Sequence, residues 1–311
     1  MNPSADNPPD NQTHAPLHTV KSAMTKTLTT LPDDLSQTVS LALAEDLGSG
    51  DITASLIDPK ASAHASIICR EDAVLCGQPW AEEVIRQLGA SAVTLEWLLT
   101  EGSDISANQT LARFTGPART LLSAERCMLN FLQTLSGTAT LSREYARLVA
   151  HTSCQLLDTR KTIPGLRTAQ KYAVAIGGCG NHRMGLFDAF LIKENHISAC
   201  GSITQAISKA RDLAPGKPVE VEVESFAELD EALDAAADII MLDNFSIADM
   251  RDAVRRNIDR GEQRSRLEAS GGITRQRLVE IAETGVDYIS IGALTKDLKA
   301  IDLSMRFDRL Q

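Results

Sequence analysis

The second half of the chain repeats one pattern six times, and this repeat constrains the fold more than any other feature. In each repeat a short apolar run ends in polar or glycine residues and is followed by a stretch with helical spacing. The runs are CQLLDTRK, AFLIKENH, VEVEVES, DIIMLDNF, RLEASGG and YISIGAL, with key positions at Asp158, Lys193, Glu222, Asp243, Ser270 and Gly292. These positions lie 35, 29, 21, 27 and 22 residues apart. Because parallel strands are joined by crossovers of this length, usually through a helix, the spacing predicts a parallel α/β barrel or open sheet.

The polar residues stand at the ends of the predicted strands. In parallel α/β folds the ligand lies at the carboxyl ends of the strands, and here almost every predicted strand ends in a charged residue or a glycine. A barrel whose top face is lined by these residues is the simplest interpretation. The sequence therefore predicts a ligand site on that face.

The first half of the chain has a different pattern, which predicts an α+β domain over residues 31–140. A helix begins near Leu35, and residues 61–118 form a small sheet with one helix, PWAEEVIRQLG. Residues 118–149 predict one long helix, or two helices broken near Ser136 and Gly137. The barrel is expected over residues 141–297, and residues 298–311 form a C-terminal segment that can pack back on the first domain. Residues 1–30 contain few large apolar side chains, so we expect them to be disordered.

The charge of the chain limits its partners. The formal net charge is -10, which argues against nucleic acid or an anionic membrane as the main partner. Yet positive charge gathers at the strand ends and the adjoining loop, in Arg160, Lys161, His182, Arg183 and Lys193. Any one of these can be an ordinary solvated surface charge. Together they suit a small anion with more than one carboxylate or phosphate.

The run VEVEVES reverses the sign of the charge. Strict alternation puts Glu220, Glu222 and Glu224 on one face of the strand, which is common for an antiparallel strand with one face in water. In a parallel barrel, one face points into the interior, where carboxylates need cations. There Glu222 and Asp243, at the ends of successive strands, could hold Mg²⁺.

The last two strand ends, ASGGIT and SIGALT, place small residues before stretches that look helical. Backbone N–H groups at a helix N-terminus bind phosphate, so Ser270, Gly271 and Gly292 are candidate phosphate ligands, although each stretch can also be an ordinary helix cap. The sequence contains no dinucleotide fingerprint, P-loop, nucleophile elbow or HExxH motif. Electrostatic stabilisation of a charged transition state fits these residues better than covalent catalysis.

The six cysteines are scattered without metal-binding spacing, which is typical of free thiols in a reducing compartment. The N-terminal residues do not resemble a signal peptide, and no run of about 18 apolar residues is present. We therefore expect a cytoplasmic protein that does not cross a membrane.

Several motifs, in order along the chain, closely resemble the quinolinate phosphoribosyltransferases, the carboxylating nicotinate-nucleotide pyrophosphorylases of the type II phosphoribosyltransferase group. They are AEDLGSGDIT, ERCMLNFLQTLSG, DTRKTIPGLR, QKYAVAIGGCGNHRMGLFDAFLIKENHI, VEVEVES, MLDNF, EASGGIT and ETGVDYISIGALT. The resemblance implies an N-terminal α+β sandwich domain followed by an incomplete TIM-like α/β barrel. It also implies that phosphoribosyl pyrophosphate and quinolinate react, with Mg²⁺, to give nicotinate mononucleotide, pyrophosphate and CO₂ in NAD synthesis.

The resemblance also assigns roles to individual residues. It implies that Arg160, His182, Arg183 and Lys193 bind quinolinate, with Lys161 between the two substrates. Glu222 and Asp243 would act through Mg²⁺ and the ribose hydroxyls, and Ser270, Gly271 and Gly292 would bind phosphate. The family forms homodimers or multiples of dimers, in which Arg126 would enter the neighbouring subunit's site.

Three rival functions remain open from the residues alone. A related phosphoribosyltransferase could use nicotinate, although a monocarboxylate needs fewer cations. A barrel aldolase could use Lys193 as a Schiff-base amine. A catalytically inactive ligand-binding or scaffold protein could keep the fold without the chemistry, but the complete set of charges at the strand ends argues against this.

Overall fold

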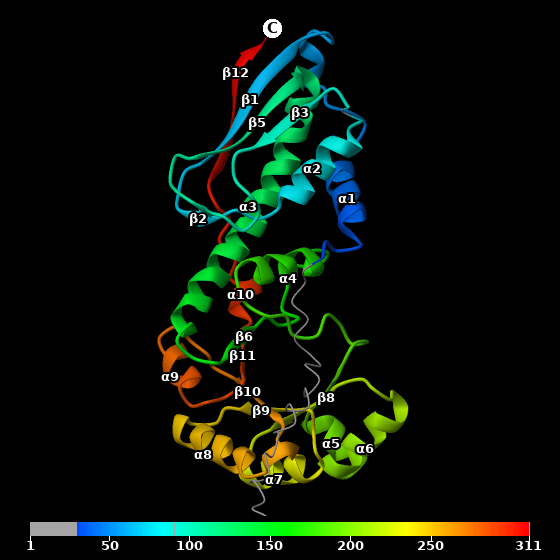
Figure 1. The fold of residues 1–311 in the computed structure, drawn as a ribbon. Coiled ribbons are helices and arrows are strands. Elements are labelled where there is room, and N and C mark those ends of the chain that lie inside the picture. Colours follow the sequence, from blue (N-terminus) through cyan, green and yellow to red (C-terminus); the bar gives the residue numbers. More distant parts are fainter. Residues whose placement is uncertain (1–29, 90, 311) are drawn as a thin grey trace, which may run out of the picture.

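The computed structural model describes residues 30–89 and 91–310. The tail that we expected to be disordered lies outside the described residues, apart from its last position. Two layered units follow one another along the chain, a small antiparallel sheet covered by helices and a larger parallel sheet with helices outside it (Figure 1). None of the helices in the described part of the chain combines the length and the apolar character needed to span a bilayer.

The first unit is a four-stranded sheet in the order β12-β1-β5-β3. Its strands are β1 (Ser62–Cys69), β3 (Thr94–Trp97), β5 (Thr110–Pro117) and β12 (Leu303–Leu310), and each neighbouring pair is antiparallel. Alternate residues of β1, from Ala63 to Cys69, are buried beneath the helices α1 (Leu35–Leu47), α2 (Gln78–Gln87) and α3 (Ala118–Val149). The strands β2 (Ala73–Val74) and β4 (Asp104–Ile105) and the 3₁₀ turn η1 (Ala54–Leu56) complete this unit. The C-terminal strand β12 thus returns to the first unit.

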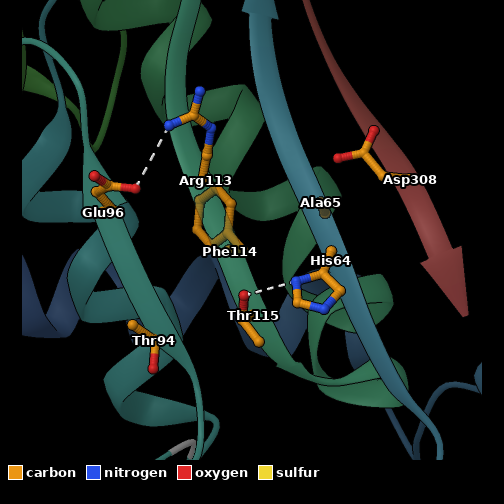
Figure 2. Close-up of a pocket in the computed structure, with 8 residues that line it drawn as sticks. All are labelled: His64, Ala65, Thr94, Glu96, Arg113, Phe114, Thr115 and Asp308. Atoms are coloured by element: carbon orange, nitrogen blue, oxygen red, sulfur yellow. Dashed lines mark hydrogen bonds and ion pairs between the residues drawn. The ribbon is translucent and has the colours of Figure 1, made fainter. Parts of the chain in front are cut away.

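The exposed face of this sheet carries a pocket of its own (Figure 2). His64 Nδ1 lies 2.9 Å from Thr115 Oγ1, and Arg113 faces Glu96 at 3.7 Å. The positive charge of Arg113 is therefore balanced by a neighbouring carboxylate. This pocket does not suit a multiply anionic substrate, and the candidate site lies in the second unit.

The second unit is a six-stranded parallel sheet in the order β6-β11-β10-β9-β8-β7. Its strands are β6 (Gln155–Leu157), β7 (Phe190–Ile192), β8 (Val219–Val223), β9 (Ile239–Asp243), β10 (Arg266–Ser270) and β11 (Tyr288–Ser290). Each strand falls within one of the six apolar runs, so the predicted parallel α/β arrangement is confirmed. Gly180 adds a single bridge to Leu157 beyond β6, but no ladder of the described residues joins that edge to β7. The barrel is therefore incomplete.

Helices connect the strands and cover the outside of the barrel. They are α4 (Arg167–Ile176), α5 (Glu194–Cys200), α6 (Ile203–Leu213), α7 (Phe226–Asp234), α8 (Ile247–Ile258), α9 (Leu278–Ala282) and α10 (Ala293–Lys296), with the 3₁₀ turn η2 (Gly261–Gln263) before β10. The side chains of Ser202, Ser225 and Ser246 cap α6, α7 and α8 by accepting a backbone N–H of the first turn. The apolar faces of these helices pack on the outward side chains of the strands.

The long helix α3 joins the two units without a break at Ser136 and Gly137 (Figure 1). Gly137 serves packing instead, because a Cβ atom there would overlap the carbonyl oxygen of Lys299 and lie 2.9 Å from Leu298 Cδ1. The Ile301 N–H donates to the Gln133 carbonyl at 3.1 Å in the same crossing. Gly137 thus lets the chain pass close over α3 before it enters β12.

Candidate active site

The inside of the barrel is polar where the outside is apolar. Val219, Val221 and Val223 of β8 pack outward in the apolar core, so Glu220 and Glu222 face inward. The strand is parallel to both β7 and β9, which rules out an antiparallel strand with one face in water. Glu224 is exposed beyond the strand end, and its backbone N–H donates to Glu228, so it does not join the two inward carboxylates.

Lys193 and Glu222 meet across neighbouring strands. Lys193 directly follows β7, and its ammonium group forms a close ion pair with Glu222 Oε2. The side chain of Glu222 is 11% exposed and that of Lys193 is 42% exposed, so the pair lies at the opening of the barrel. This contact joins a residue predicted to bind substrate with one predicted to hold a metal.

Asp243 and the glycine turn after β10 also meet. Ser270 pairs with Asp243 in the parallel ladder, and Gly271 then turns the chain with φ of +85°. A Cβ atom on Gly271 would lie 2.8 Å from Asp243 Oδ1 and 2.6 Å from Asn244 Oδ1. Asn244 Nδ2 donates to Asp243 Oδ2 at 2.8 Å. The absence of a side chain at Gly271 therefore lets the Asp243 carboxylate lie against the turn.

The two predicted phosphate segments differ in structure. Gly292 caps α10, as expected, and a Cβ atom on it would lie 3.0 Å from Lys161 Cδ. Thr295 Oγ1 donates to the Lys161 carbonyl at 2.7 Å, which fixes Lys161 beside this segment. After β10, a helix follows ASGGIT as expected, but α9 begins only at Leu278. Gly271 and Gly272, both with positive φ, form a turn between the strand and that helix.

The arginines group around the loop that follows β6. Burial, together with the nearby charge of Arg160, lowers the pKa of the Arg183 guanidinium. Arg167 donates to the carbonyls of Arg160 and Met184 at 3.4 and 3.2 Å, and so ties the two loops together. Two neighbouring positive charges repel each other, so an anion placed between Arg160 and Arg183 relieves that repulsion.

His182 lies over two buried carboxylates inside the barrel. Its Nε2 atom is 3.0 Å from Glu220 Oε2 and 3.5 Å from Glu268 Oε2. Burial disfavours the charged ring, but Glu220 and then Glu268 raise the pKa of His182 to about 10. Burial and the charge of Glu268 raise the pKa of Glu220. The Arg183 backbone nitrogen lies 2.8 Å from His182 Nδ1, and the ring presents Nε2 to the two carboxylates.

These three side chains form a possible metal-binding group within the described residues. A histidine binds a metal through an unprotonated ring nitrogen, whereas these two carboxylates favour a proton on His182 Nε2. The geometry therefore favours a proton between His182 and Glu220 over a metal. The sequence analysis missed Glu268, although its spacing of two from Ser270 places both on the inner face of β10.

Asp158 and Arg126, two residues that the sequence analysis singled out, do not join the group at the barrel opening. Asp158 ends β6 as expected, but it is fully buried and paired with Lys171, so it does not line the opening. Arg126 is exposed on α3. The structure thus brings together the barrel residues and leaves Arg126 apart.

Comparisons with known proteins agree with this geometry. Two family models match the chain, "Quinolinate phosphoribosyl transferase, N-terminal domain" over residues 51–136 and the C-terminal domain of the same family over residues 138–306. The nicotinate-nucleotide pyrophosphorylase [carboxylating] of Mycobacterium leprae is 39% identical over 88% of this chain and 97% of its own. The chloroplastic enzyme of the same name from Oryza sativa is 40% identical over 88% of this chain and 78% of its own. The solved nicotinate-nucleotide pyrophosphorylase from Francisella tularensis superposes with a TM-score of 0.86 at 48% identity, covering 91% of this chain and 100% of that one.

Proposed function

Because the chain belongs to the quinolinate phosphoribosyltransferase family, we propose that the opening of its barrel is the active site of that reaction. The enzyme transfers the phosphoribosyl group of phosphoribosyl pyrophosphate to quinolinate with loss of CO₂, giving nicotinate mononucleotide and pyrophosphate in NAD biosynthesis. The observation that carries the assignment of the site is the group of cations at the carboxyl ends of the barrel strands, within an acidic chain.

Quinolinate binds to this group of cations. It carries two carboxylates, and Arg160, Arg183 and Lys193 supply forked and point-like positive charge for them. His182, the residue before Arg183, is the fourth member of this proposed group, and its Nε2 faces Glu220 and Glu268. Holding the substrate by both carboxylates fixes the direction of its ring nitrogen, so that the nitrogen faces the ribose carbon it attacks. This positioning lowers the entropic part of the barrier.

Phosphoribosyl pyrophosphate binds on the other side of Lys161. The backbone N–H groups near Ser270, Gly271 and Gly292 suit its phosphates, because the last two positions have no side chain to keep an oxygen away. Lys161 lies against Gly292 and therefore between the phosphate segment and the arginine loop. Its charge can stabilise the leaving pyrophosphate while quinolinate attacks.

Glu222 and Asp243 would hold Mg²⁺. They supply oxygen ligands from neighbouring strands, and Mg²⁺ commonly takes one or two carboxylates together with substrate phosphates and water. The bound ion would neutralise charge on the departing pyrophosphate. The two carboxylates themselves favour the positive charge that develops on the ribose as the bond to pyrophosphate breaks.

The cations near the 2-carboxylate of quinolinate can also favour the loss of CO₂. When the 2-carboxylate leaves as CO₂, the electron pair of the broken carbon–carbon bond stays on the ring carbon. A proton then bonds to that carbon in place of the lost CO₂. A positively charged neighbour stabilises this carbanion.

The assembly is a homodimer, or a multiple of dimers, in which Arg126 enters the partner's site. Exposed apolar side chains lie on both surfaces that such a dimer would cover. Ile52 and Leu56 lie in the segment that the Ser123–Asp51 and Arg119–Ile57 hydrogen bonds hold against α3. Leu186 and Phe187 follow Arg183 in the barrel.

All six cysteines are free thiols, which suits the reducing cytoplasm.

The activity test uses purified protein with quinolinate, phosphoribosyl pyrophosphate and Mg²⁺, and follows nicotinate mononucleotide together with released CO₂. We expect product from quinolinate, no product from nicotinate in its place, and loss of activity on chelation of the metal. Product after complete chelation would contradict the assignment of Mg²⁺. Product from nicotinate alone would leave the fold intact and overturn the assignment of the cations to a dicarboxylate.

The dimer test mixes two inactive proteins, Arg126→Ala and Lys193→Ala. If Arg126 acts in the partner's site, mixed dimers contain one site with both native residues, so up to about a quarter of the wild-type activity should return. Subunit exchange is confirmed with labelled chains. Exchange without any return of activity would contradict a shared site.

A further inference from the structure

A buried charged cluster lies beneath the loop that carries His182 and Arg183, and the reaction as described makes no use of it. Asp158, at the end of β6, and Lys171, in the middle of α4, are both fully buried. The Lys171 ammonium forms a close ion pair with Asp158 Oδ1. Because neither side chain reaches the surface, neither can contact a substrate.

The cluster holds the main chain of His182 at both of its polar groups. The His182 backbone N–H donates to Asp158 Oδ1 at 2.9 Å, and Lys171 Nζ donates to the His182 carbonyl at 2.8 Å. Asn181 Nδ2 adds hydrogen bonds of 2.8 Å to Asp158 Oδ2 and to the Lys171 carbonyl. The residue before Arg183 is thus fixed from two sides.

This segment has little other support from regular structure. Residues 181–183 follow the single bridge at Gly180 and belong to no helix or strand. Their buried backbone groups need partners, and the cluster supplies them for His182. Burial raises the pKa of the Asp158 carboxyl and lowers that of the Lys171 ammonium, which shows that taking this pair out of water opposes folding.

A buried ion pair is weak evidence for a stabilising role, because well-packed apolar residues often serve stability as well or better. The hydrogen bonds of the two side chains, by contrast, all go to residues 181–182 or join the pair itself. An apolar replacement could fill the space, but it could not hold a peptide N–H and a carbonyl in place. The geometry therefore points to position rather than stability.

We propose that Asp158 and Lys171 are positioning residues for quinolinate, which place His182 and Arg183 by gripping the main chain of His182. This inference rests on the proposed assignment of His182 and Arg183 to quinolinate. A displacement of the loop would move both side chains away from the dicarboxylate, whereas Thr295 holds the Lys161 carbonyl beside the phosphate segment at Gly292. The affinity for quinolinate should therefore change while that for phosphoribosyl pyrophosphate does not.

Two double variants separate charge from hydrogen bonding. The double variant Asp158→Leu with Lys171→Met makes the pair apolar. We expect its quinolinate KM to rise about 10-fold or more, because moving a substrate-positioning group by about 1 Å can cost an enzyme about 100-fold in rate. The KM for phosphoribosyl pyrophosphate should stay within about two-fold of wild type. In Asp158→Asn with Lys171→Gln, the pair is neutral but keeps an acceptor and a donor for His182. We expect it to restore most of the quinolinate affinity.

Asn257→Ala is the matched control. Asn257 is buried and bonds the backbone of Ser265 in both directions, at 3.0 and 2.8 Å, but Ser265 precedes β10 at the amino end of the barrel. The control should lower the melting temperature without changing either KM. If it raises the quinolinate KM as much as the apolar pair does, the effect is general destabilisation and the proposal is wrong.

The remaining outcomes also decide the question. An apolar pair that folds and keeps the quinolinate KM within about two-fold of wild type would overturn the proposal. If the apolar pair does not fold, Asn181→Ala is assayed in its place. This change leaves the ion pair and removes the hydrogen bonds that Asn181 donates to Asp158 and to the Lys171 carbonyl. It should raise the quinolinate KM several-fold, and an unchanged KM would contradict the proposal. Arg183→Gln, assayed in parallel, tests the underlying assignment. If Arg183→Gln leaves the quinolinate KM unchanged, the proposed binding site is wrong. If Arg183→Gln raises this KM but the variants at Asp158, Lys171 and Asn181 leave it unchanged, only the positioning role is wrong.

Discussion

The contact between Gly271 and Asp243 gives a sharp test of the proposed metal and ribose site. We expect Gly271→Ala to lower kcat/KM for phosphoribosyl pyrophosphate by about 10-fold or more, because the new methyl group must displace the Asp243 carboxylate. A Cβ atom at Gly271 would lie 2.8 Å from Asp243 Oδ1 and 2.6 Å from Asn244 Oδ1. Ordinary contacts of a carbon atom need about 3.4 Å or more, so the Asp243 oxygen must move by roughly half an ångström.

Gly272→Ala is the control for this prediction. Gly272 also has a positive φ, +57°, so a side chain there meets a backbone cost of about 1–2 kcal/mol, as it does at Gly271. Its Cβ atom, however, would have no atom of the described chain within 4 Å. We therefore expect a similar loss of stability but a much smaller loss of activity. The comparison isolates the displacement of Asp243 from the cost of the turn.

The assay measures initial rates at several Mg²⁺ concentrations, and urea unfolding gives the stability of each variant. We expect Gly271→Ala to need more Mg²⁺ for half-maximal rate than either wild type or Gly272→Ala. Equal losses of activity in the two variants would refute the reasoning, because the shared backbone cost would then explain both. A wild-type Mg²⁺ requirement in Gly271→Ala would show that Asp243 is not a metal ligand.

Three further predictions concern the substrate cations, the crossing over α3 and the protonation of His182. Arg160→Ala should raise the quinolinate KM about 10-fold or more, or abolish turnover, with an unchanged circular dichroism spectrum; near-normal kinetics would contradict its role. Gly137→Ala should lower the free energy of unfolding by about 1–3 kcal/mol despite the better helix propensity of alanine, because its methyl group overlaps the Lys299 carbonyl; a more stable variant in urea unfolding would contradict this packing. The folded-state pKa of His182, about 10, lies above its ordinary value of 6.5, so its contribution to stability is fully present below pH 6.5 and lost as the pH rises towards 10. The difference in unfolding free energy between wild type and His182→Gln should shrink over this range, by no more than about 1.4 kcal/mol per pH unit, and a constant difference would count against the raised pKa.

The order of strands and helices could be predicted because it depends on local pattern. Each of the six apolar runs contains one strand of the parallel sheet, and the intervals between them contain the helices. The predicted helix after ASGGIT is present, but Gly271 and Gly272 both adopt positive φ and turn the chain before α9 begins. Of the two arrangements predicted for residues 118–149, the structure has the single long helix, because Gly137 serves a contact with the distant residue Lys299.

Within the site, sequence reasoning identified side chains but not their partners. It placed Lys193 and Glu222 in one region, and the structure joins them in an ion pair. It placed Asp158 at a strand end that lines the ligand face, whereas the structure buries this carboxylate and pairs it with Lys171. No local pattern distinguishes a lysine that faces substrate from one that supports a loop from beneath, because the difference is set by which helix packs on which strand.

The sequence by itself therefore determined the class of fold, the edge of the sheet where charge gathers and the kind of anion that such charge suits. These follow from the periods of two and 3.6 residues and from the rule that parallel strands end on one face. The tertiary structure decided that His182 lies over Glu220 and Glu268, and that the Asp243 carboxylate lies against Gly271. It also decided that Lys171 pairs with Asp158 beneath the loop that carries His182 and Arg183. Each of these contacts joins residues from different elements, and only the packing of those elements brings their atoms within a few ångströms.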